Sequence, residues 1–106
     1  KLVYVGDAGR VDNLLEVAAG ADALIIEATY LEVEAELAAQ FGHITAAQAA
    51  GLASEAGVQC LFLVHISRRS SERMVLAEAT PIFANTIVPR DLDQYRILRG
   101  HCEAGE

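Results

Sequence analysis

Four side chains in the sequence have the types and spacing that metal-dependent hydrolysis requires. Asp7, Glu27 and His65 each follow or end a short apolar run, and His43 lies just before a segment with helical spacing. Carboxylate oxygens and imidazole nitrogens that converge on one point are the ligands that a divalent metal needs. Asp7, His65 and His43 together are therefore candidates for a metal site, and Glu27 is a further candidate for chemistry beside it.

Each of the four also has an ordinary structural interpretation. Asp7 has the chemistry of a turn residue or a helix cap, and His43 that of a surface or capping residue. His65 fits a strand-end histidine with a satisfied hydrogen bond, and Glu27 fits a carboxylate paired with a surface cation. The arrangement of the four along the chain, rather than any one of them, favours a shared site.

Strands that alternate with helices must position these side chains. Continuous apolar runs predict buried strands at residues 2–5, 23–26 and 59–64. Helices are predicted at residues 13–19, 31–40, 46–56 and from 74 to about 80, then short strands at 86–88 and 94–98. This alternation indicates the α/β class. If the buried strands are parallel, Asp7, Glu27 and His65 gather at one edge of the sheet, just past the strand ends.

Two of the predicted helices carry specific signals. Val33, Leu37 and Phe41 recur at intervals of four, which predicts that this face of the second helix is buried. Thr45 and Gln48 match a capping box, which predicts that the third helix begins directly after Thr45.

Composition limits the classes that remain. The chain has 106 residues, 53% of them hydrophobic, which suits one small packed domain or a piece of a larger one. The formal net charge of −7 argues against a general nucleic-acid binder, although bound divalent metals would reverse the sign locally. Neither a membrane span nor a signal peptide is recognisable. Lys1 runs directly into an apolar stretch, which suggests a cut point within a longer protein.

The two cysteines occupy unlike surroundings. Cys60 lies in an apolar strand pattern and Cys102 in a polar tail that we expect to be frayed from Arg99 onward. We therefore expect no disulfide between them, and a reducing, cytoplasmic setting.

Four segments, taken in order over residues 2–98, resemble the C-terminal half of ribonuclease Z, the family of tRNA 3′-processing endonucleases in the metallo-β-lactamase superfamily. The segments are Gly6-Asp7, residues 21–30 with Ile26-Glu27-Ala28-Thr29, residues 42–50 with Gly42-His43-Ile44-Thr45, and residues 63–69 with Val64-His65-Ile66-Ser67. The resemblance implies half of an αββα four-layer sandwich, with one mixed sheet and helices on one face. It divides the chain into residues 1–98 of such a domain and a tail, 99–106.

The resemblance also implies a role for each candidate residue. Asp7 matches the aspartate that bridges two zinc ions, and His65 matches the last metal-ligand histidine. His43 matches a histidine that acts near the scissile phosphate, and Glu27 matches a glutamate that orients that histidine. Arg69 matches an arginine that approaches phosphate. Zinc is therefore the expected metal, at two ions per intact site, with other divalent metals also possible.

Several positions depart from the family pattern. Ile26 stands where the family has histidine, Ala8 where it has threonine, and Ile44 where it has serine. Residues 68–70 also differ from the usual Pro-Arg-Tyr. Because groups around metal ligands tune their orientation and pKa, these changes bear on the substrate more than on the metal.

The family's His-x-His-x-Asp-His cluster has no match in the chain. We expect the isolated chain to be catalytically silent and to bind zinc weakly, because catalytic zinc normally has three protein ligands. The expected function of the longer protein is a dinuclear-metal phosphodiesterase that processes precursor tRNA. Its expected partners are the N-terminal half of the same domain and a second copy in a homodimer. The alternatives are a superfamily hydrolase of small phosphodiesters, cyclic nucleotides or esters, and a non-catalytic interaction domain.

Overall fold

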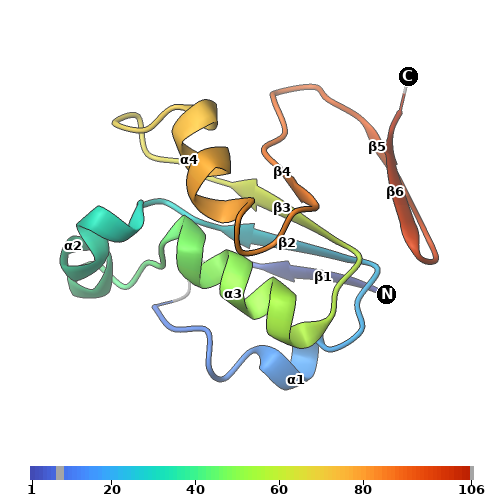
Figure 1. Ribbon diagram of the computed structural model, residues 1–106, viewed down its shortest axis with the longest axis horizontal. Helices are drawn as coiled ribbons and strands as arrows, with labels where there is room; N and C mark the ends of the chain where they lie inside the picture. The colour runs from blue at the N-terminus through green and yellow to red at the C-terminus, as the bar shows by residue number, and fades with distance from the viewer. Residues whose placement is uncertain (7–8, 106) are drawn as a thin grey trace.

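The computed structural model describes residues 1–6 and 9–105, so Asp7, Ala8 and Glu106 lie outside the described residues. Strands and helices alternate over most of this chain, as predicted (Figure 1). The elements are β1 (Leu2–Val5), α1 (Leu15–Ala18), β2 (Ala23–Glu27), η1 (Glu32–Glu34), α2 (Ala35–Gln40), α3 (Ala46–Ala56), β3 (Cys60–Val64), α4 (Glu72–Ala79), β4 (Thr86–Ile87), β5 (Tyr95–Leu98) and β6 (His101–Ala104).

The central sheet has the strand order β1-β2-β3-β4, and every described pair in it is parallel. In the register, Val5 lies opposite Ile26, and Glu27 lies opposite Val64. The carboxyl ends of β1, β2 and β3 therefore meet at one edge, as the α/β interpretation requires. Among the described residues, antiparallel pairing occurs only in a separate hairpin of β5 and β6, so the four-stranded sheet itself is parallel rather than mixed.

One face of the sheet is covered by helices. Because side chains alternate along a strand, Leu24 and Ile26 of β2 share this face with Leu61 and Leu63 of β3, and all four are fully buried. Helix α3 lies along the face and contacts α1 and α4 on its two sides (Figure 1). Its buried alanines leave little side chain between helix and sheet, so the helix packs closely.

The opposite face is only partly covered. Ala23, Cys60 and Phe62 form a small core with side chains of the hairpin. The ring of Phe62 meets that of Tyr95 edge to face, with centroids 5.0 Å apart. Farther from the hairpin the face is open, because Leu2 and Tyr4 of β1 are 58% and 63% exposed.

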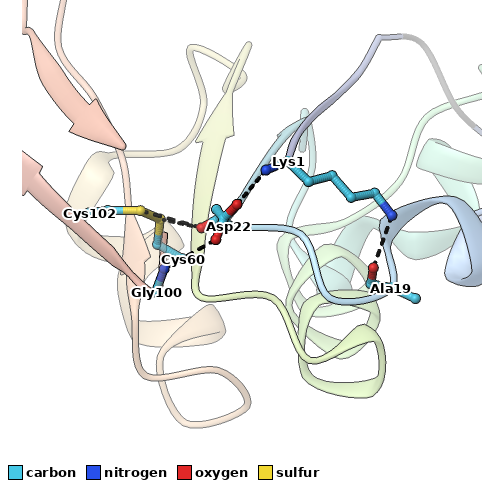
Figure 2. A network of polar contacts seen from close by, with 6 residues as sticks. All are labelled: Lys1, Ala19, Asp22, Cys60, Gly100 and Cys102. Atoms are coloured by element: carbon cyan, nitrogen blue, oxygen red, sulfur yellow. Dashed lines mark hydrogen bonds and ion pairs between the residues drawn. A yellow bond between two sulfur atoms is a disulfide. The ribbon is translucent and has the colours of Figure 1, made fainter. Parts of the chain in front are cut away.

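A disulfide joins Cys60 in β3 to Cys102 in β6, so the prediction of unpaired cysteines is wrong. The sulfur atoms of Cys60 and Cys102 lie 3.3 and 3.5 Å from the carbonyl oxygen of Asp22. Figure 2 shows both sulfur atoms beside this oxygen. The Asp22 carboxylate accepts the backbone N–H of Gly100 at 3.1 Å and pairs with the α-ammonium group of Lys1, while the side-chain ammonium of Lys1 donates to the Ala19 carbonyl. The sequence pattern failed here because the hairpin folds back over the sheet and brings a distant segment to the start of β3.

Two further expectations are wrong. Val33 and Phe41 are 90% and 62% exposed, so the stripe predicted to face the core does not do so. The segment divides into η1 and α2, and this break in helical phase buries Leu31 and Ala38 instead. The tail expected to be frayed contains β6, which pairs with β5.

Candidate functional site

Glu27 and His65 meet at the carboxyl edge of the sheet. Glu27 is the last residue of β2, and His65 directly follows β3. The Nδ1 atom of His65 lies 3.2 Å from Oε1 of Glu27, and the two side chains are 61% and 16% exposed. Because an ionised carboxylate can only accept, Nδ1 must carry the shared hydrogen. The other ring nitrogen, Nε2, is therefore the one available to a metal ion.

The backbone at His65 is in an uncommon conformation. Its φ of 57° lies in the left-handed region, which few non-glycine residues adopt. Such a conformation costs about 1–2 kcal/mol and usually persists where it aims a functional side chain. Hydrogen bonds flank it: Ala28 N–H donates to the Val64 carbonyl, and Ser67 N–H donates to the Thr29 carbonyl, both at 3.0 Å.

Two buried oxygen atoms beside this pair have no hydrogen-bond partner within the described part of the chain. They are Oε2 of Glu27 and Oγ1 of Thr29. Unsatisfied buried polar atoms are costly and rare in folded proteins. Their presence at the same strand end indicates a place where a group from outside the described residues completes the hydrogen bonding.

His43 occupies the loop between α2 and α3. Gly42 has a φ of 72°, which turns the chain, and the backbone N–H of His43 donates to the Ala38 carbonyl at 2.8 Å. The imidazole ring lies 5.9 Å from the Tyr30 ring, centroid to centroid. Since Tyr30 follows β2 three residues after Glu27, this contact joins the His43 loop to the strand end that holds Glu27.

The chain close to Asp7 lies against the same loop. A Cβ placed on Gly9 would come within 3.3 Å of the Cα of Gly42, so Gly9 packs directly on the residue before His43. Asp7 itself lies outside the described residues, and its role as a metal ligand stays a prediction.

Arg69 points toward α2 and η1. Its Nη1 atom lies 3.2 Å from Oε2 of Glu34, and its side chain is 71% exposed. Together with residues 32–37 it lines an open groove of about 460 Å³. A phosphate at Arg69 would have to compete with Glu34 for the guanidinium group.

Within the described residues, no cluster of three or more His, Cys, Asp or Glu side chains has metal-site geometry. The fit to a metal is nevertheless good at His65, because metal-binding histidines commonly donate their other N–H to a carboxylate, as His65 does to Glu27. A metal held by His65 would need further ligands, either Asp7 or residues outside the described part of the chain.

Two of the departures from the family pattern lie in the core. Ile26 is fully buried against the helices and therefore projects from the opposite side of β2 to Glu27. Ile44 is likewise buried, at 1% exposed. The expectation that these departures bear on the substrate more than on the metal stays a prediction.

Comparison with known proteins gives consistent results. No protein-family model matches the chain. Proteins named ribonuclease Z are similar over most of it. The protein of Bradyrhizobium diazoefficiens is 43% identical over 93 residues, which cover 88% of this chain and 31% of that protein. That of Brevibacillus brevis is 42% identical over 106 residues, which cover 93% and 33%. That of Archaeoglobus fulgidus is 42% identical over 93 residues, which cover 86% and 30%.

The chain is similar in sequence to part of ribonuclease Z. The resemblance seen in the sequence is thereby confirmed. The chain spans about a third of the length of the curated ribonuclease Z relatives that it matches. Its fold matches the metallo-β-lactamase fold protein YhfI of Bacillus subtilis with a TM-score of 0.78 and 23% identity, over 98% of this chain and 39% of that one. The chain therefore has the fold of part of a metallo-β-lactamase domain.

Sequence reasoning missed residues that support the site. Tyr30 forms an isolated parallel bridge with Thr45, and Glu78 accepts hydrogen bonds from the segments on both sides of the His43 loop. Tyr30 lay within the segment that carried the resemblance, but no signal marked its contact with His43. In the sequence, Glu78 resembles the other glutamates expected on the exposed side of an amphipathic helix, so no local sequence signal marked it.

Proposed function

We propose that the longer protein containing this chain is a dinuclear-metal phosphodiesterase that processes the 3′ ends of precursor tRNA. The observation that carries the proposal is the similarity of nearly the whole chain to proteins named ribonuclease Z. The Glu27–His65 pair at the sheet edge supports it, because it has the geometry of an oriented metal ligand.

In this proposal His65 and Asp7 are metal ligands and zinc is the metal. Glu27 holds the imidazole of His65 through Nδ1, so that Nε2 is directed to the ion. When bound, a pair of zinc ions would supply a nucleophilic water at neutral pH and neutralise charge on the phosphate. The remaining ligands belong to the part of the domain that this chain does not include.

His43 is proposed to act on the departing oxygen of the scissile phosphate, as a hydrogen-bond donor or an acid. Its loop is fixed by the Ala38 carbonyl and by the ring of Tyr30, so the imidazole has a defined position relative to Glu27. Arg69 is proposed to bind substrate phosphate after exchanging its pairing with Glu34 for that anion.

The open face of the sheet is the proposed contact with the N-terminal half of the same domain. Leu2 and Tyr4 are exposed there, and a groove of about 200 Å³ is lined by Ile25, Phe62, Val64, Pro89, Tyr95 and Ile97. An apolar area of this kind is normally covered in a folded protein. A homodimer of the complete protein is also proposed, and light scattering of that protein measures it.

The main alternative substrate is a small phosphodiester. The test compares cleavage of precursor tRNA and of bis(p-nitrophenyl) phosphate by the complete protein. Efficient cleavage of precursor tRNA at its 3′ end supports the proposal, whereas efficient cleavage of the small ester alone contradicts it. His65→Ala and Asp7→Ala should lose both metal and activity, and His43→Ala should lose rate while retaining metal.

The third possibility is a non-catalytic interaction domain. It predicts that the complete protein binds no stoichiometric metal and cleaves neither substrate. Metal analysis of the purified complete protein, followed by the same two assays, separates this possibility from both hydrolases.

A role in tRNA processing would place the protein in the cytoplasm. Within the part of the chain that the structure describes, no helix has the length and apolar character needed to cross a membrane. The Cys60–Cys102 disulfide, however, is more typical of an oxidising compartment. Cell fractionation combined with alkylation of free thiols tests the location and the redox state together.

A further inference from the structure

Glu78 on α4 accepts backbone hydrogen bonds from two different segments. Its Oε1 and Oε2 atoms accept the N–H of Glu32 at 2.9 and 3.1 Å, and Oε2 also accepts the N–H of Ala47 at 2.9 Å. Glu32 begins η1, and Ala47 lies in the first turn of α3. The Glu78 carboxylate therefore connects α4 to η1 and to α3, neither of which is next to α4 in the sequence.

These bonds complete the start of α3. The first N–H groups of a helix have no partner within it. In α3 the Ala46 N–H donates to the Tyr30 carbonyl at 2.9 Å, the Ala47 N–H donates to Glu78, and the Gln48 N–H donates to Oγ1 of Thr45 at 3.1 Å. Thr45 is the residue directly before the helix, whereas Tyr30 and Glu78 belong to other segments, so the start of α3 is fixed in space by Tyr30 and Glu78.

The same network reaches the segment after Glu27. The hydroxyl of Thr45, which is fully buried, donates to Oε2 of Glu32 at 2.6 Å. Because Glu78 holds the N–H of Glu32, it also fixes the residue that receives the Thr45 hydroxyl. Hydrogen bonds to a charged acceptor are stronger than those between neutral groups, which makes Glu78 an effective clamp.

His43 lies two residues before Thr45, and Glu27 lies five residues before Glu32. We propose that Glu78 is a positioning residue, which fixes the His43 loop relative to the strand end that carries Glu27 and His65. The inference rests on the proposed function, in which His43 acts on the substrate. Glu78 does not touch the reacting groups in this proposal; it acts through the first turn of α3.

The test is a double-mutant cycle in the complete protein with precursor tRNA as substrate. Glu78→Ala should lower kcat by about tenfold to a hundredfold with little change in KM, because small displacements of a catalytic group cost this much. Glu78→Gln retains one acceptor oxygen and should lose less. In a His43→Ala background Glu78→Ala should cost little more, since its effect passes through His43.

Glu72→Ala is the matched control. Glu72 is on the same helix and pairs with Arg90 at 3.3 Å, away from α3 and η1. It should leave kcat unchanged in both backgrounds. An equal loss of kcat from Glu78→Ala with and without His43, or no loss at all, overturns the inference. If Glu78→Ala does not fold, Glu78→Gln takes its place in the same cycle.

Failure of the proposed function gives a different result. If His43→Ala alone leaves the rate unchanged, the role of His43 is wrong, whatever the Glu78 variants do. If His43→Ala lowers the rate but the Glu78 effect is simply additive, only the positioning role is wrong. Amide hydrogen exchange at Glu32 and Ala47 should become faster in Glu78→Gln but not in Glu72→Ala. Unchanged exchange in Glu78→Gln would show that Glu78 does not hold these two backbone N–H groups in place.

Discussion

Oε1 of Glu27 and Nδ1 of His65 lie 3.2 Å apart across the carboxyl ends of two neighbouring parallel strands. The pairing fixes which ring nitrogen carries the hydrogen and so leaves Nε2 for a ligand. The resemblance implied instead that Glu27 orients His43, and that role, like a metal at His65, stays a prediction.

The pair predicts how metal affinity depends on Glu27. In the complete protein, Glu27→Gln should weaken metal binding by about tenfold to a hundredfold, because the neutral amide orients the imidazole of His65 less strongly. Titration with metal against a chromophoric chelator measures the change. Glu16→Gln, on the exposed side of α1, is the control and should bind metal normally. Wild-type affinity in Glu27→Gln would mean that the contact does not support metal binding.

The left-handed backbone of His65 predicts an unusual order of stability. In metal-free protein, His65→Gly should be more stable than His65→Ala by about 1 kcal/mol, because glycine adopts a φ of 57° without strain. Urea unfolding measures the difference. Arg68 does not have a positive φ, so at that position the glycine variant should be less stable than the alanine variant. The same order at both positions would contradict the strained conformation of His65.

The caps of α3 and α4 should differ in strength. Thr45 accepts the Gln48 N–H and also donates to Glu32, whereas Ser71 accepts only the Met74 N–H among the bonds described. Thr45→Ala should therefore cost about 2 kcal/mol and Ser71→Ala about 1 kcal/mol. Thermal or urea unfolding of both variants tests this. An equal cost would mean that the Thr45–Glu32 bond adds nothing to the cap.

Local patterns were sufficient where one short segment decides the structure. The apolar runs predicted β1, β2 and β3, and the spacing of Thr45 and Gln48 predicted the start of α3. Because these strands are parallel, the position of Glu27 and His65 at their carboxyl ends followed directly. That much of the candidate site could be predicted without a structure.

Contacts between distant segments could not be predicted in this way. Cys60 and Cys102 are 42 residues apart in sequence, and Glu78 is 31 residues from Ala47. Their partners are set by how the hairpin and α4 pack on the sheet, which no local pattern encodes. The exposed Val33 shows the related failure, since a period of four cannot reveal that η1 interrupts the helix.

The surroundings of Asp22 predict a loss of stability in acid. In the chain that begins at Lys1, the hydrogen bond from its N-terminal α-ammonium group is the largest cause that lowers the pKa of Asp22 below its ordinary value of 3.8, and the Gly100 N–H adds to it. A depressed folded-state pKa contributes stability that is present above the unfolded value and is lost as the pH falls through the folded one. Asp22→Asn should therefore lose less stability on acidification than the wild-type chain, measured as thermal midpoints from about pH 6 to about pH 2. Asp91→Asn, at an exposed loop position, should behave like wild type.

The Cys60–Cys102 disulfide should make stability depend on reductant. It closes a loop of 42 residues, and a cross-link of this length is expected to contribute about 4 kcal/mol by restricting the unfolded chain. Adding dithiothreitol should lower the urea midpoint of the wild-type chain, and it should raise hydrogen exchange in β5 and β6, which the bond ties to β3. A double variant, Cys60→Ala with Cys102→Ala, should have the same low urea midpoint as the reduced wild-type chain, with or without dithiothreitol. A wild-type midpoint that reductant leaves unchanged would show that packing of Tyr95 on Phe62, rather than the disulfide, holds the hairpin on the sheet.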